Sequence, residues 1–205
     1  MRIAPNTHTL DISSGGAGMF PVLTWDDEHT VLIDAGYPGQ LDLFVRAIAD
    51  AGRRAEDITQ IILTHQDIDH IGCVRGLLEL APGARVVAHV DEAAYIDGTL
   101  PPIKGFPSLN IHVDQTVADG EVLPYCGGIE VVHAPGHTPG SMCLFLRSSG
   151  IMVGGDAFNI AHGSITGPNP QYTQDMDQGR RSLERILARK PAAVVAYHGG
   201  YLKCE

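Results

Sequence analysis

The structure is most readily inferred from one segment, Ile61-Ile62-Leu63-Thr64-His65-Gln66-Asp67-Ile68-Asp69-His70. Its first three residues form a continuous apolar run, which is typical of a buried strand. Two imidazoles and two carboxylates follow within six residues, and buried carboxylates must be paired, hydrogen-bonded or bound to a cation. An acidic, solvated loop with two incidental histidines is the alternative. We predict that these four side chains hold a divalent metal ion, or two of them.

Composition narrows the class of protein. With 205 residues, 44% hydrophobic and 19% charged, the chain is expected to form one compact domain over residues 1–205. The formal net charge of −10, with 14 Lys and Arg residues, argues against a nucleic-acid partner. No apolar run is long enough for a signal peptide or a membrane helix, so we expect a cytoplasmic protein without a membrane partner.

The spacing of apolar residues predicts strands that alternate with helices, followed by a second group of strands. Breaker residues predict loops over 98–108 and 157–173. The predicted strands cover 7–13, 18–25, 29–34, 59–63, 86–88, 111–113, 121–123, 129–132, 142–146, 151–154 and 192–196. The predicted helices lie between Gly39 and Gly52 and over 71–80, 91–96 and 175–189.

Three further candidate ligands stand where a predicted strand ends and a glycine-bearing loop begins, a place where sites are commonly built. They are His137, Asp156 and His198. Taken singly each is a weak signal, because isolated histidines and Gly-Asp turns are common. His133 stands four residues before His137, but it ends a predicted strand, and we therefore do not assign it to the metals.

Taken together, five ordered motifs resemble those of the metallo-β-lactamase fold superfamily. The resemblance spans almost the whole chain and implies an α/β (α+β) fold. That fold is a four-layer αβ/βα sandwich of two mixed sheets with helices outside and a metal site at one edge. The motifs are Leu32-Ile33-Asp34-Ala35-Gly36, Thr64-His65-x-Asp67-x-Asp69-His70, Gly136-His137-Thr138-Pro139-Gly140-Ser141, Gly155-Asp156 and His198-Gly199.

The resemblance also implies a ligand set for two divalent metal ions, with zinc as the first choice and manganese or iron as alternatives. Asp156 would bridge the two ions, and Asp34 would orient a ligand from behind. The first ion would be held by His65, Asp67 and His137, and the second by Asp69, His70 and His198.

One position departs from the superfamily pattern. The usual HxHxDH motif has a histidine where this chain has Asp67. A carboxylate there makes the first site more anionic and harder, which favours manganese or iron more than an all-histidine site does. A second interpretation is that Asp67 does not ligate a metal and that the first site is only partly formed.

The implied function is a binuclear metal-dependent hydrolase that uses a hydroxide shared by both ions to attack a small ester, lactone or thioester. Asp69 would orient the attacking water or accept its proton, and Tyr172 is a candidate donor to the substrate oxygen. A mononuclear iron oxygenase built on His65, Asp67 and His137 is an alternative, and so is a non-catalytic metal-binding protein. The expected partner is a small-molecule substrate, with homodimer formation left open.

Overall fold

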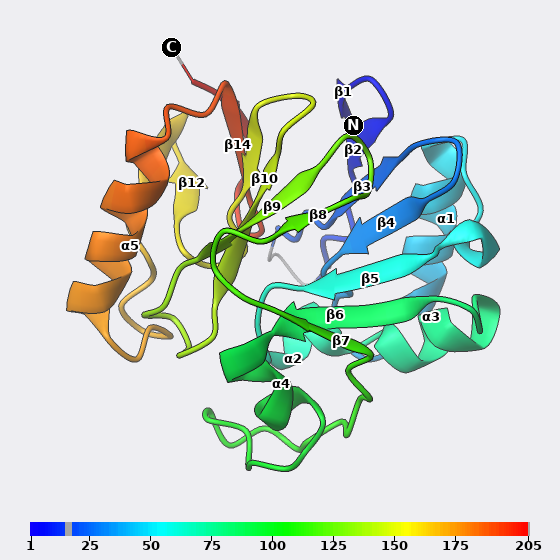
Figure 1. The fold of residues 1–205 in the computed structure, drawn as a ribbon, viewed down its shortest axis with the longest axis horizontal. Coiled ribbons are helices and arrows are strands. Elements are labelled where there is room, and N and C mark those ends of the chain that lie inside the picture. Colours follow the sequence, from blue (N-terminus) through cyan, green and yellow to red (C-terminus); the bar gives the residue numbers. More distant parts are fainter. Residues whose placement is uncertain (15–17, 205) are drawn as a thin grey trace.

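The computed structural model describes residues 1–14 and 18–204, which form two mixed β-sheets stacked face to face with helices on both outer sides (Figure 1). This is the four-layer αβ/βα arrangement predicted from the sequence. The seven-stranded sheet has the order β1 (Arg2–Ala4), β2 (Thr7–Thr9), β3 (Val22–Trp25), β4 (Thr30–Ile33), β5 (Gln60–Leu63), β6 (Arg85–His89) and β7 (Gln115–Val117). The six-stranded sheet has the order β15 (Gly200–Lys203), β14 (Ala193–Ala196), β11 (Ile151–Val153), β10 (Met142–Leu146), β9 (Ile129–His133) and β8 (Val122–Leu123).

The helices cover the outer faces of both sheets. Figure 1 shows α5 against the six-stranded sheet and α1 and α3 against the seven-stranded sheet. Phe44 on α1 and Leu77 on α3 belong to one outer core, and Ile186 on α5 belongs to the other. The helices are α1 (Leu41–Asp50), α2 (Ile68–Ile71), α3 (Val74–Leu80), α4 (Val90–Ile96), α5 (Met176–Ala188) and the short 3-10 helix η1 (Ala55–Asp57).

The central strands are apolar without interruption because both of their faces are covered. In β4, Val31 and Ile33 point into the core between the sheets, whereas Leu32 points outward to the helices, as the two-residue period of a strand requires. All three side chains are fully buried. Burial of a side chain of this size contributes about 1.5–3 kcal/mol, so the stacked layers are held chiefly by apolar packing.

Strand direction brings several loops to one edge of the sandwich. β4, β5 and β6 run parallel in the first sheet, and β11 and β14 run parallel in the second. β9 runs in the same direction as β11, because both pair antiparallel with β10 between them. The carboxyl ends of β9, β11 and β14 therefore meet at the same edge of their sheet.

The structure differs from the sequence prediction at several places. The predicted strand 111–113 is wrong, because Ile111 N donates a hydrogen bond to Ile96 O at the end of α4, and β7 begins only at Gln115. The predicted loop 157–173 contains a hairpin of β12 (Asn159–Ala161) and β13 (Ser164–Thr166). The edge strands β1 and β15 are additional.

The predicted helix 71–80 begins earlier and is interrupted near Gly72. α2 ends at Ile71 and α3 starts at Val74. A Cβ atom on Gly72 would lie 2.2 Å from Pro38 N, so the glycine allows the two chain segments to approach closely. None of the helices in the described part of the chain is both long and apolar enough to cross a membrane.

Candidate metal centre

The first four donors lie in the loop after β5 and in α2. The loop is held by Asp34, which follows β4 and adopts a left-handed backbone conformation with φ of 65°. Thr64 N donates to Asp34 Oδ1 at 2.8 Å, and His70 Nδ1 lies 2.9 Å from Asp34 Oδ2. A proton on Nδ1 in this hydrogen bond leaves the His70 Nε2 lone pair directed into the centre. Asp34 is thus in contact with the side of the His70 ring that faces away from the centre, which is the position of a residue that orients a metal ligand.

The other three donors each follow a strand of the six-stranded sheet. His137 comes after β9, Asp156 after β11 and His198 after β14. Gly136, with φ of 137°, precedes His137, and a Cβ atom there would lie 2.4 Å from Gly179 N on α5. Only glycine combines that conformation with so close an approach of the loop to the helix.

The structure brings the predicted first group together. His137 Nε2 lies 3.0 Å from Asp67 Oδ2, and His65 Nε2 lies 3.4 Å from the same oxygen. His137 Nε2 is also 3.5 Å from Asp156 Oδ2. One donor atom from each of His65, His137 and Asp156 can be chosen so that all three lie within 4.8 Å of one another.

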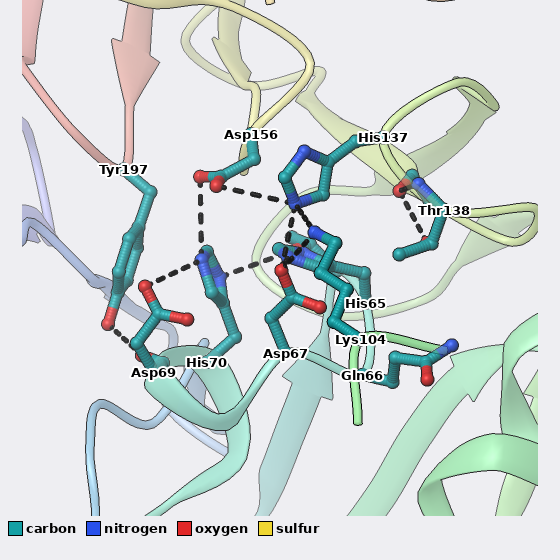
Figure 2. A network of polar contacts seen from close by, with 12 residues as sticks. His65, Gln66, Asp67, Asp69, His70, Lys104, His137, Thr138, Asp156 and Tyr197 are labelled. Atoms are coloured by element: carbon teal, nitrogen blue, oxygen red, sulfur yellow. Dashed lines mark hydrogen bonds and ion pairs between the residues drawn. The ribbon is translucent and has the colours of Figure 1, made fainter. Parts of the chain in front are cut away.

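The second group is equally close. His198 Nε2 lies 3.1 Å from Asp69 Oδ2, and His70 Nε2 lies 3.7 Å from that oxygen. Asp156 Oδ1 stands 3.4 Å from His70 Nε2 and 3.7 Å from His198 Nε2. Asp156 therefore turns one oxygen toward each group, as a bridging ligand would (Figure 2).

The donors fit a divalent metal ion. Among the described residues, His65 Nε2, His70 Nε2 and Asp156 Oδ1 are buried without a hydrogen-bond partner. A buried polar atom left in this way costs about 1–3 kcal/mol, and a bound cation is the kind of partner that such donors accept. Imidazole nitrogens and carboxylate oxygens suit zinc, manganese and iron.

The carboxylates are kept in their charged form. Burial by itself raises the pKa of Asp156, but the charges of the neighbouring histidines, His70 above all, outweigh burial, and the pKa lies well below its ordinary value. The pKa of Asp67 is also far below its ordinary value, because His65 and His137 outweigh the effect of burial. Both carboxylates are consequently available to a cation.

Lys104 also reaches into the centre, which the sequence analysis did not predict. Its Nζ donates a short hydrogen bond to Asp67 Oδ2 and lies 2.7 Å from His137 Nε2. Figure 2 shows the lysine nitrogen beside both side chains. The side chain of Lys104 is 15% exposed. No periodicity could have located it, because it lies in the loop rich in proline and glycine between α4 and β7.

Glu92 on α4 is a second residue that the sequence analysis missed. It is fully buried, and its carboxylate accepts hydrogen bonds from Gln66 N at 2.9 Å, Gln66 Nε2 at 3.0 Å and Gly140 N at 2.9 Å. Glu92 thereby joins the loop of Asp67 to the loop of His137. The signal available in the sequence was its position four residues before the apolar Ile96 on a helix.

A cleft of about 350 Å³ opens over the donors. Tyr172, the candidate substrate-binding residue, lines it with its side chain 52% exposed. Aromatic and amide side chains form the rest of the wall, and carboxylates and a histidine form part of the floor. The lining residues are Tyr37, Asp67, Asp69, Lys104, Phe106, Asp156, Asn159, Asn169, Tyr172 and His198.

His133 lies apart from the seven donors. Its ring stacks on that of His89 with centroids 4.1 Å apart, and together with Asp91 the two form a separate group. His133 Nε2 lies 2.9 Å from Pro139 O.

A four-layer sandwich that gathers histidine and aspartate donors at one edge defines a class of metal-dependent hydrolases. The family model described as the metallo-beta-lactamase superfamily matches residues 21–198. The chain belongs to the metallo-β-lactamase superfamily and is an enzyme of its metal-dependent hydrolase type.

Individual proteins agree with this assignment. A probable metallo-hydrolase of Bacillus subtilis is 29% identical over 96% of this chain and 84% of its own length. A hydroxyacylglutathione hydrolase of Francisella philomiragia is 27% identical over 77% of this chain, which corresponds to 55% of that protein. The crystal structure of a metallo-beta-lactamase family protein from Thermus thermophilus has a TM-score of 0.79, with 20% identity over 98% of this chain and 76% of its own. At that identity the solved structure shows the fold alone.

Proposed function

We propose that the protein hydrolyses a small ester, lactone or thioester with the help of divalent metal ions. The observation that carries the proposal is the convergence of seven nitrogen and oxygen donors below a cleft of about 350 Å³. Clefts of about 300–1,000 Å³ are the usual size for small-molecule ligands. The wall of aromatic and amide groups suits a substrate that has both apolar and polar parts.

Divalent ions in this centre would make a water molecule nucleophilic near neutral pH and polarise the bond that it attacks. Asp69 would hold the proton that the water gives up, since its carboxylate lines the cleft and lies 3.1 Å from His198. Burial raises the pKa of Asp69, but the charge of His70 and the hydrogen bond from His198 together outweigh burial, and the pKa is lowered. Tyr172 would donate a hydrogen bond to the substrate oxygen from the cleft wall.

The substrate class is supported by a relative and by chemistry. The relative from Francisella philomiragia is named for the hydrolysis of an acyl conjugate of glutathione, and it matches 77% of this chain. Acyl carbonyls are attacked through a transition state with charge on oxygen, which a cation and a phenol donor stabilise. Esters, lactones and thioesters share this chemistry, and the proposal covers all three.

The donor set would suffice for two ions, with zinc as the first choice and manganese or iron as alternatives. The two groups are not equivalent, however. Asp69, His70 and His198 face one another without a competing cation among the described residues, whereas Asp67 and His137 contact Lys104. The number of ions bound therefore depends on what Lys104 does in the first group.

The same contact argues against an iron oxygenase. A facial triad needs two histidines and one carboxylate that are free to bind iron. Two of the three candidate residues, Asp67 and His137, are in contact with the Lys104 ammonium. This contact therefore argues only against an oxygenase built on these three residues, and oxygen consumption by the iron-loaded protein would favour such an enzyme.

A panel of chromogenic esters, lactones and thioesters tests the proposal. Turnover should vanish with a chelator and return with Zn²⁺ or Mn²⁺. Asp156→Asn should lower kcat/KM by about 100-fold or more, since the bridging charge is lost. Asp27→Asn, at an exposed position, is the matched control and should retain full activity. Turnover that is insensitive to both the chelator and Asp156→Asn would exclude metal-dependent hydrolysis.

A further inference from the structure

Lys104 touches the donor atoms themselves rather than the rim of the cleft. Its Nζ contacts Asp67 Oδ2 and lies 2.7 Å from His137 Nε2. Both atoms also face the rest of the first group. Asp67 Oδ2 lies 3.4 Å from His65 Nε2, and His137 Nε2 lies 3.5 Å from Asp156 Oδ2. The ammonium thus stands among the atoms that would coordinate the first ion.

The position of Lys104 is held by its neighbours. Ile103 N donates a hydrogen bond to Gln66 Oε1 at 2.9 Å, and Gln66 is held in turn by the buried carboxylate of Glu92. The side chains of Lys104 and Asp67 are 15% and 10% exposed, respectively. The pair is therefore tethered beside the donor loop and largely withdrawn from water, unlike a surface ion pair.

An ammonium and a metal ion cannot share these donors. His137 Nε2 can accept a hydrogen bond from Lys104, donate one to Asp67 or bind a metal ion. Because this nitrogen has either one lone pair or one hydrogen, each of these roles excludes the other two. The aspartate at position 67 matters here, because a carboxylate attracts an ammonium, whereas the histidine of the usual superfamily motif would not. The aspartate in place of the usual histidine and the lysine beside it are thus explained together, as the two partners of one ion pair.

We propose that Lys104 is the resident cation of the first donor group, so that the protein binds one divalent ion, at Asp69, His70 and His198 with Asp156. This inference rests on the metal centre of the proposed function and changes its stoichiometry. Lys104 supplies the fixed positive charge of the first position, and the divalent ion occupies the second. Asp67 serves as the partner of the ammonium instead of a metal ligand.

Zinc stoichiometry provides the test. The metal-free protein is dialysed to equilibrium against a micromolar excess of Zn²⁺, and bound zinc is measured by elemental analysis. We expect about one ion per chain for the unmodified protein and about two for Lys104→Met, which removes the charge but keeps the length. Lys203→Met, the same change at an exposed position, should stay at one. Circular dichroism verifies that each variant is folded.

Two additional variants keep the test decisive if Lys104→Met is unstable. Lys104→Arg keeps the charge and should remain at one ion, whereas the pair Asp67→His with Lys104→Met restores an imidazole and should bind two. Two ions in the unmodified protein, or one in every folded variant, would overturn the role of Lys104 while leaving the metal centre intact. No zinc in any of the proteins would overturn the metal centre and this inference with it.

Discussion

The two sheets contribute to the metal centre in different ways. The seven-stranded sheet supplies four donors within six residues, through one loop and the short helix α2. The six-stranded sheet supplies three donors, one after each of β9, β11 and β14. Asp34 and Glu92 brace the first loop from both sides, whereas the loop of His137 is held by Glu92 and by α5. The four donors of the seven-stranded sheet therefore form a half of the centre that is braced locally. The three donors of the six-stranded sheet form a second half, whose position depends on how the two sheets are joined.

Glu92 joins the two halves, and its loss should have the largest effect. Glu92→Ala would leave Gln66 N and Gly140 N buried without their acceptor and should lower the free energy of unfolding by about 3 kcal/mol or more. Chemical denaturation measures this loss. Glu79→Ala, on the exposed face of α3, is the matched control and should change stability by less than about 0.5 kcal/mol. Equal stability of the two variants would show that the halves do not need this link.

Asp34 tests the locally braced half alone. Asp34→Asn keeps the size of the side chain and tolerates the left-handed backbone, but it removes the charge that faces His70. We expect zinc affinity to fall about 10–100-fold, since the partner behind a ligand commonly contributes that much. Competition with a chromogenic chelator measures the affinity. An exposed counterpart on α1, Asp42→Asn, should bind zinc as the unmodified protein does, and unchanged affinity in Asp34→Asn would contradict the bracing role.

Ser182 tests the other half and should give the smallest effect. Its hydroxyl on α5 donates to Pro135 O at 2.7 Å, just before the loop of His137. Ser182→Ala should cost about 1 kcal/mol of stability, the usual value for one hydrogen bond. Thermal denaturation with and without zinc measures both the loss and any change in metal binding. A fall in zinc affinity larger than that of Asp34→Asn would reverse the proposed order of the two halves.

Much of this arrangement was predictable because its signals are local. The donors from His65 to His70 follow an apolar strand directly, and His137, Asp156 and His198 each follow a strand beside a glycine. The uninterrupted apolar run of a strand such as β4 indicates that both of its faces are buried. Sequence patterns of this kind depend on neighbours a few positions apart and predict individual strands and helices, whereas the four-layer arrangement was implied by the resemblance to the superfamily.

Lys104 and the hairpin β12–β13 were missed for the opposite reason. Lys104 lies 37 positions from Asp67, in a segment whose prolines and glycines set no regular direction for side chains. The hairpin strands have three residues each and are not buried, so they lack the apolar alternation on which strand prediction depends. Contacts between segments that are distant in the sequence and have no periodic pattern can be identified only from the three-dimensional structure.

The distance along the chain between Asp69 and His198, 129 positions, has a consequence for stability in the cell. These two side chains meet only when β14 has taken its place between β11 and β15. An ion that binds both therefore binds the native chain and not the unfolded one, and it adds about 2.7 kcal/mol when free metal is 100 times the dissociation constant. The supply of metal would then affect the fraction of chains that survives proteolysis as well as the fraction that is active.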